Sequence, residues 1–253
     1  MKLIISPAKK MNSEVDGLAW RTLPVFLDAT GQLLDRLRGM SYPELKKLWG
    51  CSDALARPNF ERLQRMDLRR GLVPALLCYE GIQYQYMAPG VFTGPEYDYL
   101  SGHLRILSGF YGLLRPFDGV TPYRLEMQAK LQVGQAKDLY NFWNSRIADA
   151  LFEDTDWVLN LASKEYSLCV SRYLRPPVRM VTCVFGELRE GRVVEKGTLC
   201  KMARGAMVRY LAERQTEDPD VIRAFSELGY RYAPQCSEES RWTFLREGDT
   251  NTG

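Results

Sequence analysis

The stretch VRMVTCVFGELREGRVVEK, residues 178–196, decides the fold class. Two apolar, β-branched runs flank Glu190-Gly191, and this pattern predicts an antiparallel β-hairpin. Further buried strands are predicted earlier in the chain, at residues 2–6, 75–79, 105–109 and 157–163. Helical patterns alternate with them, at residues 82–99 (together with loop), 138–152, 164–174 and 199–215. Because alternating strands and helices favour parallel pairing and the hairpin does not, we expect an α/β to α+β fold with a mixed central sheet and surrounding helices.

Residues 24–72 are expected to form a small helical insertion. Apolar side chains at helical spacing predict a first helix over residues 24–38. Ser41 and Glu44 form a capping-box pattern at the start of a second helix, and a third helix follows it. Basic side chains lie around the joints between these helices: Arg36, Arg38, Lys46 and Lys47.

Length and composition favour one globular domain. The 253 residues are 45% hydrophobic and 26% charged, which disfavours a disordered, collagen-like or coiled-coil protein. The chain shows no repeat or linker, so we expect a single compact domain over residues 1–247 and an unstructured tail over residues 248–253. The start MKLIISPAKK lacks a signal-peptide core or a membrane span, and the six cysteines form no C-x-x-C pair. We therefore expect a cytoplasmic protein with free thiols and no membrane association.

Charge and histidine content limit the possible chemistry. The net charge is +3, short of the strongly basic balance of a dedicated nucleic-acid domain, so any DNA binding depends on where the charges lie. His103 is the only histidine, and a Ser-His-Asp hydrolase or a His-rich zinc site would have to use it. We expect a structural role for His103, no metal site and no cofactor.

The densest candidate site is LRILSGFYGLLRPFDGVTPYRLEM, residues 104–127. Its glycines permit tight turns after a predicted strand, and its planar guanidinium groups suit phosphate or carboxylate ligands. These groups belong to Arg105, Arg115 and Arg124. Internal ion pairs with acidic neighbours such as Glu126 explain the same residues, and we weigh the two interpretations equally.

Three more segments have similar chemistry. In NLASKEYS, residues 160–167, a strand leads into a helix start whose N–H groups, with Lys164, favour an anion; an ordinary helix cap by Ser163 is an equally good explanation. In KMARGAMVRYLAER, residues 201–214, Lys201 and Arg204 share a helix face, and Gly205 indicates close packing. In SPAKK, residues 6–10, two lysines follow a buried strand. Solvated basic surfaces are the simpler interpretation of the last two segments.

Five segments together resemble the YaaA family of peroxide stress proteins. In chain order they are SPAKKM, the stretch 104–127, KDLYNFW at residues 137–143, NLASKEYS and KMARGAMVRYLAER. The resemblance implies a cytoplasmic bacterial protein of the peroxide response that limits damage to DNA and protein and keeps unincorporated iron low. It also implies an α/β fold with a basic cleft and a helix-hairpin-helix element that binds double-stranded and distorted DNA.

Carried onto this chain, the resemblance places the hairpin element at residues 33–57 and gives two hypotheses. The favoured one is a monomeric DNA-binding protein, with no enzyme activity or cofactor, that contacts phosphates without reading sequence. Its candidate contacts are Lys9, Lys10, Arg36, Arg38, Lys46, Lys47, Arg105, Arg115, Arg124, Ser163, Lys164, Lys201 and Arg204. The alternative is an enzyme acting on a nucleotide, a nucleobase or a similar anionic small molecule. Its candidate base, proton carrier and amide residues are Lys9, Glu126, Asn160, Lys164 and Glu165.

Overall fold

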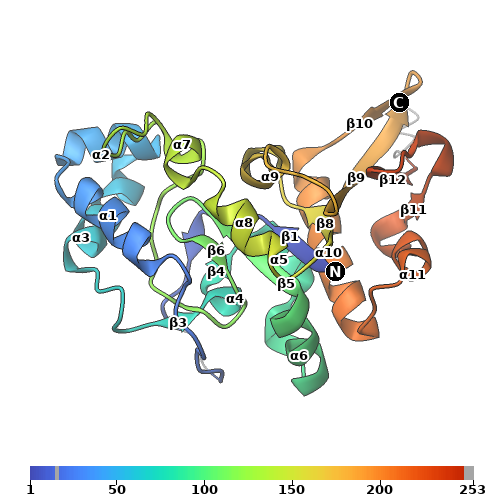
Figure 1. Cartoon of the computed structure of the whole chain (residues 1–253), viewed down its shortest axis with the longest axis horizontal. Coiled ribbons are helices and arrows are strands. Elements are labelled where there is room, and N and C mark those ends of the chain that lie inside the picture. Colours follow the sequence, from blue (N-terminus) through green and yellow to red (C-terminus); the bar gives the residue numbers. More distant parts are fainter. Residues whose placement is uncertain (15–16, 248–253) are drawn as a thin grey trace.

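Strand β1 (Lys2–Ile5) lies in the middle of an eight-stranded sheet and organises the fold (Figure 1). The computed structural model describes residues 1–14 and 17–247. In it, β1 pairs in parallel with β5 (Leu104–Ser108) on one side and with β8 (Trp157–Leu161) on the other. Leu3, Ile4 and Ile5 are fully buried, as expected for a strand covered on both faces of the sheet.

Parallel pairing continues from β8 to β9 (Arg179–Arg189) and on to β12 (Arg241–Arg246). Antiparallel strands lie at both edges: β6 (Gly112–Leu114) pairs with β5, and β11 (Tyr230–Tyr232) pairs with β12. A third antiparallel strand, β10 (Arg192–Val194), pairs with the end of β9. The strand order is β11-β12-β9-β8-β1-β5-β6. This mixed sheet confirms the predicted α/β to α+β class and the late hairpin.

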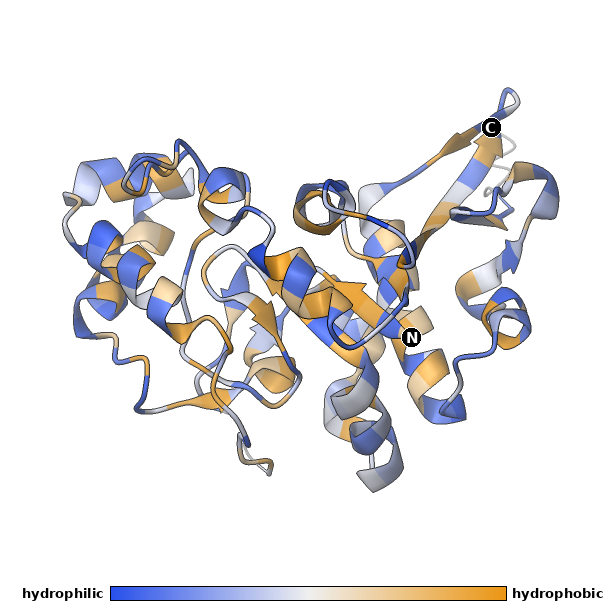
Figure 2. Cartoon of the chain, viewed as in Figure 1, coloured by the Kyte–Doolittle hydropathy of each residue, from blue (hydrophilic) through white to orange (hydrophobic). Residues whose placement is uncertain are grey.

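Helices surround the sheet, and two short strand pairs tie its loops together. The strand pairs are β2 (Lys10–Met11) with β4 (Tyr79–Glu80), and β3 (Val73–Pro74) with β7 (Gly119–Val120). The helices are α1 (Leu27–Arg38), α2 (Tyr42–Trp49), α3 (Asp53–Arg65), α4 (Ala75–Cys78), α5 (Ile82–Met87), α6 (Gly94–His103), α7 (Leu139–Trp143), α8 (Arg146–Phe152), α9 (Lys164–Ser171), α10 (Gly197–Arg214) and α11 (Pro219–Arg223), with 3-10 turns at Pro89–Val91, Glu227–Gly229 and Pro234–Cys236. Figure 2 shows the apolar strands at the centre and helices with alternating apolar and polar residues around them. Together they form a single α/β domain.

Residues 75–79 correct the sequence prediction, because they form helix α4 and the start of β4 rather than a buried strand. A short apolar run fits a buried helix as well as a buried strand, so periodicity could not separate them. The Tyr79 N–H closes the helical turn on the Ala75 carbonyl, and long-range bonds satisfy the first N–H groups: that of Ala75 donates to the Asp118 carbonyl and that of Leu76 to the Pro116 carbonyl. The predicted helix over residues 138–152 is likewise two helices, α7 and α8.

Helices α1, α2 and α3 form the expected insertion, at the opposite end of the molecule from the β9–β10 hairpin (Figure 1). The capping box is present, since the Glu44 carboxylate accepts hydrogen bonds from the Ser41 N–H (2.8 Å) and hydroxyl (2.6 Å). Gly50 ends α2 in the left-handed conformation, at φ 55°. The tail predicted at residues 248–253 lies outside the described residues. Within the described ranges, no helix is long and apolar enough to cross a membrane.

Candidate functional site

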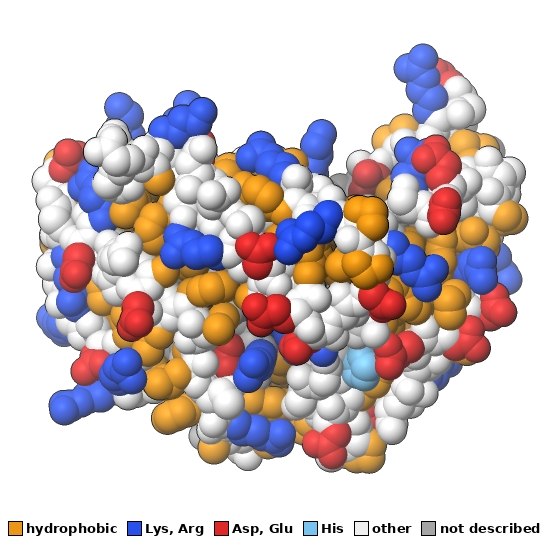
Figure 3. Space-filling view, viewed as in Figure 1, with side chains coloured by type: hydrophobic (Ala, Val, Ile, Leu, Met, Phe, Trp, Pro, Cys, Tyr) orange, Lys and Arg blue, Asp and Glu red, His pale blue; other side chains and the backbone are white. Residues whose placement is uncertain are grey.

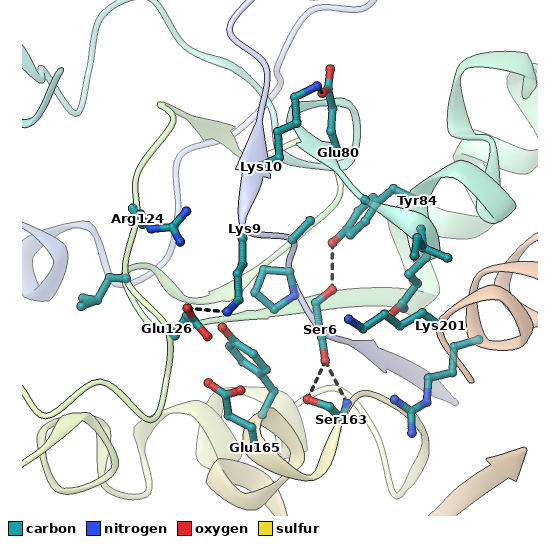
Figure 4. A pocket seen from close by; sticks show the side chains of 18 of the residues that line it. Ser6, Lys9, Lys10, Glu80, Tyr84, Arg124, Glu126, Ser163, Glu165 and Lys201 are labelled. Carbon is teal, nitrogen blue, oxygen red and sulfur yellow. Dashed lines mark hydrogen bonds and ion pairs between the residues drawn. The ribbon is translucent and has the colours of Figure 1, made fainter. Parts of the chain in front are cut away.

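The carboxyl ends of β1 and β8 meet at a cavity of about 410 Å³. Ser6 follows β1, and its hydroxyl accepts from the Ser163 N–H (2.8 Å) and donates to the Ser163 hydroxyl (3.2 Å). The Tyr84 hydroxyl donates to the Ser6 carbonyl at 3.0 Å (Figure 4). Open α/β sheets bind ligands at the carboxyl ends of their strands, and the volume lies within the range of about 300–1,000 Å³ typical of small-molecule sites.

Cationic side chains from three distant segments line this cavity. The segment after β1 supplies two lysines, the loop after β7 supplies one arginine, and α10 supplies a lysine and an arginine: Lys9, Lys10, Arg124, Lys201 and Arg204. Three carboxylates share the wall, so cations outnumber them: Glu80, Glu126 and Glu165. The cavity therefore favours an anionic ligand.

Ion pairs occupy some of these charges. Lys9 pairs with Glu126 at 2.9 Å, and Lys10 pairs with Glu80 at 2.5 Å (Figure 4). Lys201 has no ion pair among the described residues, and Figure 4 shows its side chain extending toward Ser6. Lys201 therefore keeps its charge available to a ligand at the Ser6 end of the cavity.

Three residues that line the cavity each have a buried side-chain nitrogen without a hydrogen-bond partner. The nitrogens are Nε of Arg124, Nε of Arg204 and Nε2 of Gln83, whose residue is only 7% exposed. The other such atoms in the described part of the chain are the indole nitrogens of Trp49 and Trp157. An unsatisfied buried donor costs about 1–3 kcal/mol, so a water molecule or a ligand that accepts hydrogen bonds from these nitrogens would stabilise the protein.

Close packing of α10 against α5 positions two of these donors. A Cβ on Gly205 would lie 2.0 Å from the Gln83 carbonyl oxygen, so only glycine permits the observed approach of the two backbones. Arg204 precedes this contact on α10, and Gln83 lies opposite it on α5. A terminal nitrogen of the Arg204 guanidinium pairs with Glu195 at 3.5 Å, and Nε of Arg204 is left without a partner. The predicted close packing at Gly205 is thereby confirmed.

The other end of the cavity is acidic. Figure 4 shows Glu126 and Glu165 on the same side of the cavity, with the ammonium group of Lys9 between Glu126 and the interior. Burial raises the pKa of Glu165, and the negative charge of Glu126 adds to the effect, while an N–H from Gln128 at 3.2 Å opposes it. Glu165 therefore holds its proton more tightly than an exposed glutamate.

Aromatic rings form part of the wall. Tyr84, Tyr123 and Tyr166 line the cavity. The Tyr123 hydroxyl lies 2.9 Å from the hydroxyl of Tyr79 and 2.7 Å from that of Ser108, and burial raises its pKa to about 12. Tyr123 is therefore neutral at physiological pH and held in place from behind the cavity.

Replacing Glu165 with glutamine is expected to stabilise the protein increasingly as pH rises. Because the pKa of Glu165 is raised above its ordinary 4.5, the folded state binds more protons than the unfolded state just above that value. Wild-type stability therefore falls as pH rises through the folded pKa, and glutamine removes this loss while keeping an oxygen for the Gln128 N–H. Thermal unfolding of both proteins between about pH 4 and pH 7 measures the difference. A melting-point difference that shrinks with rising pH would contradict the assignment.

The structure brings together eight of the site residues named from the sequence and separates the others. Lining the cavity are Lys9, Lys10, Arg124, Glu126, Ser163, Glu165, Lys201 and Arg204. Arg115 and Lys164 are exposed and do not line it. Asn160 is buried, where it donates to Thr182 Oγ1 (3.2 Å) and accepts from the Ala162 N–H (2.9 Å). Arg105 is also buried and bonded to backbone carbonyls, so both are structural residues in this fold.

The helical insertion uses most of its basic residues internally. The Arg36 guanidinium donates to the Gln132 carbonyl at 3.0 Å, and Lys46 pairs with Asp53 at 2.5 Å. Lys47 is exposed in the last turn of α2 and has no ion pair among the described residues. Of the four basic residues at these joints, Lys47 is the one whose side chain has neither an ion pair nor a hydrogen bond among the described residues.

Replacing Arg38 with alanine is expected to lower the free energy of unfolding by about 2 kcal/mol, the size of a lost charged hydrogen bond. The Arg38 side chain donates to three carbonyls at the end of α3, those of Leu63 (3.1 Å), Gln64 (3.3 Å) and Met66 (2.5 Å). Urea unfolding measures the loss, and Lys47→Ala is the matched control, expected within about 0.5 kcal/mol of wild type. Equal stabilities for the two variants would refute the structural role of Arg38.

Sequence reasoning did not single out Gln83 or Glu80. Gln83 precedes Tyr84 in an aromatic-rich stretch, and its amide matters only because α5 and α10 bury it beside the cavity. Ser6 belongs to the SPAKK segment, which the sequence marks because it follows the first predicted strand. Among the described residues, no three His, Cys, Asp or Glu side chains are grouped so that they could hold a metal ion.

Comparison with known proteins agrees with the resemblance seen in the five segments. The UPF0246 protein of Lachnoclostridium phytofermentans is 51% identical over 251 residues, which cover 99% of this chain and 98% of the relative. The UPF0246 protein of Lactiplantibacillus plantarum is 52% identical over 245 residues, covering 97% of this chain and 99% of the relative. A family model described as peroxide stress protein YaaA matches residues 1–236. The chain therefore belongs to the family of the peroxide stress protein YaaA.

Proposed function

We propose that this member of the peroxide stress family binds double-stranded or structurally distorted DNA through the cavity and its rim, without reading the sequence. One observation carries the proposal: five cationic side chains from three distant segments converge on one cavity, and two of them have an unpaired buried Nε. Phosphate oxygens are the acceptors that guanidinium and ammonium groups bind best in nucleic acids.

The distribution of charge over the surface supports a localised contact. On the face shown in Figure 3, lysine and arginine side chains are interspersed with aspartate and glutamate and form no broad basic surface. The overall charge is only +3. DNA affinity would therefore depend on the cavity cations and on a second contact at the α2–α3 hairpin, where Lys47 is exposed.

The proposal includes the cellular role that the family resemblance implies. The protein acts as a monomer in the cytoplasm, limits peroxide damage to DNA and protein, and keeps unincorporated iron low. It requires no cofactor and no membrane. DNA binding is the part of this role that the arrangement of side chains supports directly.

Binding to a labelled duplex and to a duplex with an unpaired bubble, across a salt series, tests the proposal. Lys201→Gln and Lys47→Gln should each weaken binding to all sequences equally and reduce the slope of log affinity against log salt by about 1. Arg231→Gln, an exposed arginine on β11 away from both contacts, is the matched control and should bind like wild type. No binding near physiological salt, or equal effects of all three substitutions, would refute the proposal.

An enzyme acting on a nucleotide, a nucleobase or a similar anionic molecule is the second candidate. The observation that favours it is the presence of Glu126, Glu165 and the Gln83 amide in the cavity, because a track for phosphates needs none of them. Glu165, with its raised pKa, would carry the proton, and the ammonium group of Lys9, 2.9 Å from Glu126, would hold the anionic group of the substrate. Asn160 and Lys164 take no part, since neither lines the cavity.

Incubating the protein with a panel of nucleotides and separating the products by chromatography tests this candidate. Conversion of one nucleotide, reduced at least 100-fold in Glu165→Gln, is expected of general acid catalysis. Glu227→Gln, at an exposed glutamate outside the cavity, is the matched control and should retain full activity. Turnover that is the same in both variants would exclude Glu165 as the proton carrier.

A further inference from the structure

We infer that the cavity is a pocket for one nucleotide unit, which binds with its phosphate near Lys201 and Arg204 and its base near Glu126 and Glu165. The inference rests on the proposed function, because the nucleotide is the unit from which DNA is built. The cavity volume of about 410 Å³ suits a ligand of this size and is too small for a double helix.

The phosphate end is built from unpaired donors. Gln83 is 7% exposed, and its Nε2 has no partner; Arg204 has a free Nε; and Lys201 has no ion pair among the described residues. Gly205 allows the backbone of α10 to contact the Gln83 backbone, so all three donors lie around this contact between α10 and α5. A phosphate group there would accept hydrogen bonds from donors that otherwise stay unsatisfied.

The start of helix α9 adds to this end. Ser163 is the N-cap residue, and its side chain makes no capping hydrogen bond because it interacts with Ser6. The Ser163 N–H is bonded to Ser6, and those of Tyr166 and Ser167 are bonded to the Ser163 carbonyl. The N–H groups of Lys164 and Glu165 have no hydrogen-bond partner among the described residues, and they lie in the position where helix N-termini bind phosphate.

The opposite end has the chemistry of a base-recognition site. Glu126 and Glu165 can accept hydrogen bonds from the exocyclic amino groups of a base, as carboxylates do from cytosine. The protonated form of Glu165, which burial favours, can also donate to a ring nitrogen or carbonyl. Tyr84 and Tyr166 supply aromatic surface along the wall between the two ends.

A nucleotide with this chemistry has two possible sources: free mononucleotide, or one nucleotide extruded from DNA. Extrusion costs a few kcal/mol of lost stacking and pairing, and least at a mismatch or bulge. A pocket of this kind would therefore give the protein a preference for distorted over fully paired DNA. The shared ligand in both cases is a base joined to a phosphate through a sugar.

Fluorescence titration with 2-aminopurine tests the inference on the full chain in three forms of the probe. These are the free 2-aminopurine deoxyriboside 5′-monophosphate, the same base in a fully paired duplex, and the same base in a single-nucleotide bulge. Gln83→Met and Arg204→Gln remove pocket donors, and Lys47→Gln is the control outside the pocket. We expect the two pocket substitutions to weaken binding of the free or the bulged probe about 10-fold, as for a lost hydrogen bond to a charged group. Lys47→Gln should leave the free probe unaffected.

Melting temperature separates a binding role of Gln83 from a structural one. Removing an unsatisfied buried amide by a side chain of similar shape should leave the melting temperature of Gln83→Met equal to or above that of wild type. Weaker binding by such a stable variant supports a ligand-binding role.

The remaining outcomes separate the two proposals. A response of the free probe alone identifies free mononucleotide as the ligand, and a response of the bulged probe alone identifies extruded nucleotide. If the paired duplex binds but neither probe responds to the pocket substitutions, the inference is wrong and the DNA-binding function stands. If the free probe binds in the pocket but no duplex binds near physiological salt, the DNA-binding function is wrong and the pocket stands.

Discussion

Replacing Gly205 with alanine is expected to lower the free energy of unfolding by about 3 kcal/mol, at the upper end of typical overpacking costs. The added Cβ would lie 2.0 Å from the Gln83 carbonyl oxygen and 3.0 Å from the Met87 nitrogen. Both are backbone atoms of α5, so no side chain can rotate away and the two helices must separate. The gain in helix propensity, about 1 kcal/mol, offsets only part of this cost.

Urea unfolding followed by circular dichroism measures the Gly205 effect, and α1 provides its matched control. Gly31 lies inside α1, where an added Cβ meets no atom within 4 Å. Gly31→Ala should therefore gain up to about 1 kcal/mol from helix propensity alone. Separation of α5 from α10 would also displace Gln83 and Arg204, so Gly205→Ala should lose binding of the nucleotide probe. A Gly205→Ala protein as stable as Gly31→Ala would show that the helices do not pack as described.

Replacing Gly109 with alanine is expected to lower stability by about 2 kcal/mol, which corresponds to a drop in melting temperature of about 4–8 °C for a protein of this size. Gly109 follows β5, and a Cβ there would lie 2.8 Å from the Leu125 carbonyl oxygen and 2.9 Å from the Glu126 carbonyl carbon. The Trp143 indole donates to the Gly109 carbonyl at 2.9 Å, so the glycine cannot simply shift away. The passing segment carries Glu126, and its displacement would open the acidic end of the cavity.

Thermal unfolding measures the Gly109 effect, with Gly102→Ala in α6 as the matched control, because an added Cβ at Gly102 meets no atom within 4 Å. The control should be neutral or slightly stabilising. Similar melting temperatures for the two variants would mean that residues 125–127 move without cost and do not form a fixed wall.

Particular elements show how far local pattern determines this fold. Continuous apolar runs predict β1, β5 and β8 correctly, because a parallel strand covered on both faces of the sheet buries every side chain. The capping box at Ser41 is equally local, since its bonds span only three residues. The strand predicted at residues 75–79 was wrong, because a short apolar run fits a helix as well as a strand, and the N–H groups of Ala75 and Leu76 find their partners about 40 positions away.

For the candidate site residues too, local pattern predicts some features, and the tertiary structure decides the others. The sequence predicted Lys201 and Arg204 on one helix face, and it predicted basic and acidic residues after strands. It could not separate Arg124, which reaches the cavity, from Arg105, which is buried against backbone carbonyls. Both are arginines in one polar segment, and only their burial and partners differ.

The sequence by itself determined the fold class, the family and the segments that carry charge, because strand burial, helix capping and residue type depend on neighbouring residues. The tertiary structure alone decided which charges converge and which are used internally. Gln83 is the clearest case, since nothing near it in sequence marks its amide as unsatisfied. Nε2 of Gln83 is buried without a partner because α10 packs closely against α5 at Gly205. A buried donor can be satisfied only by the groups that the fold places beside it.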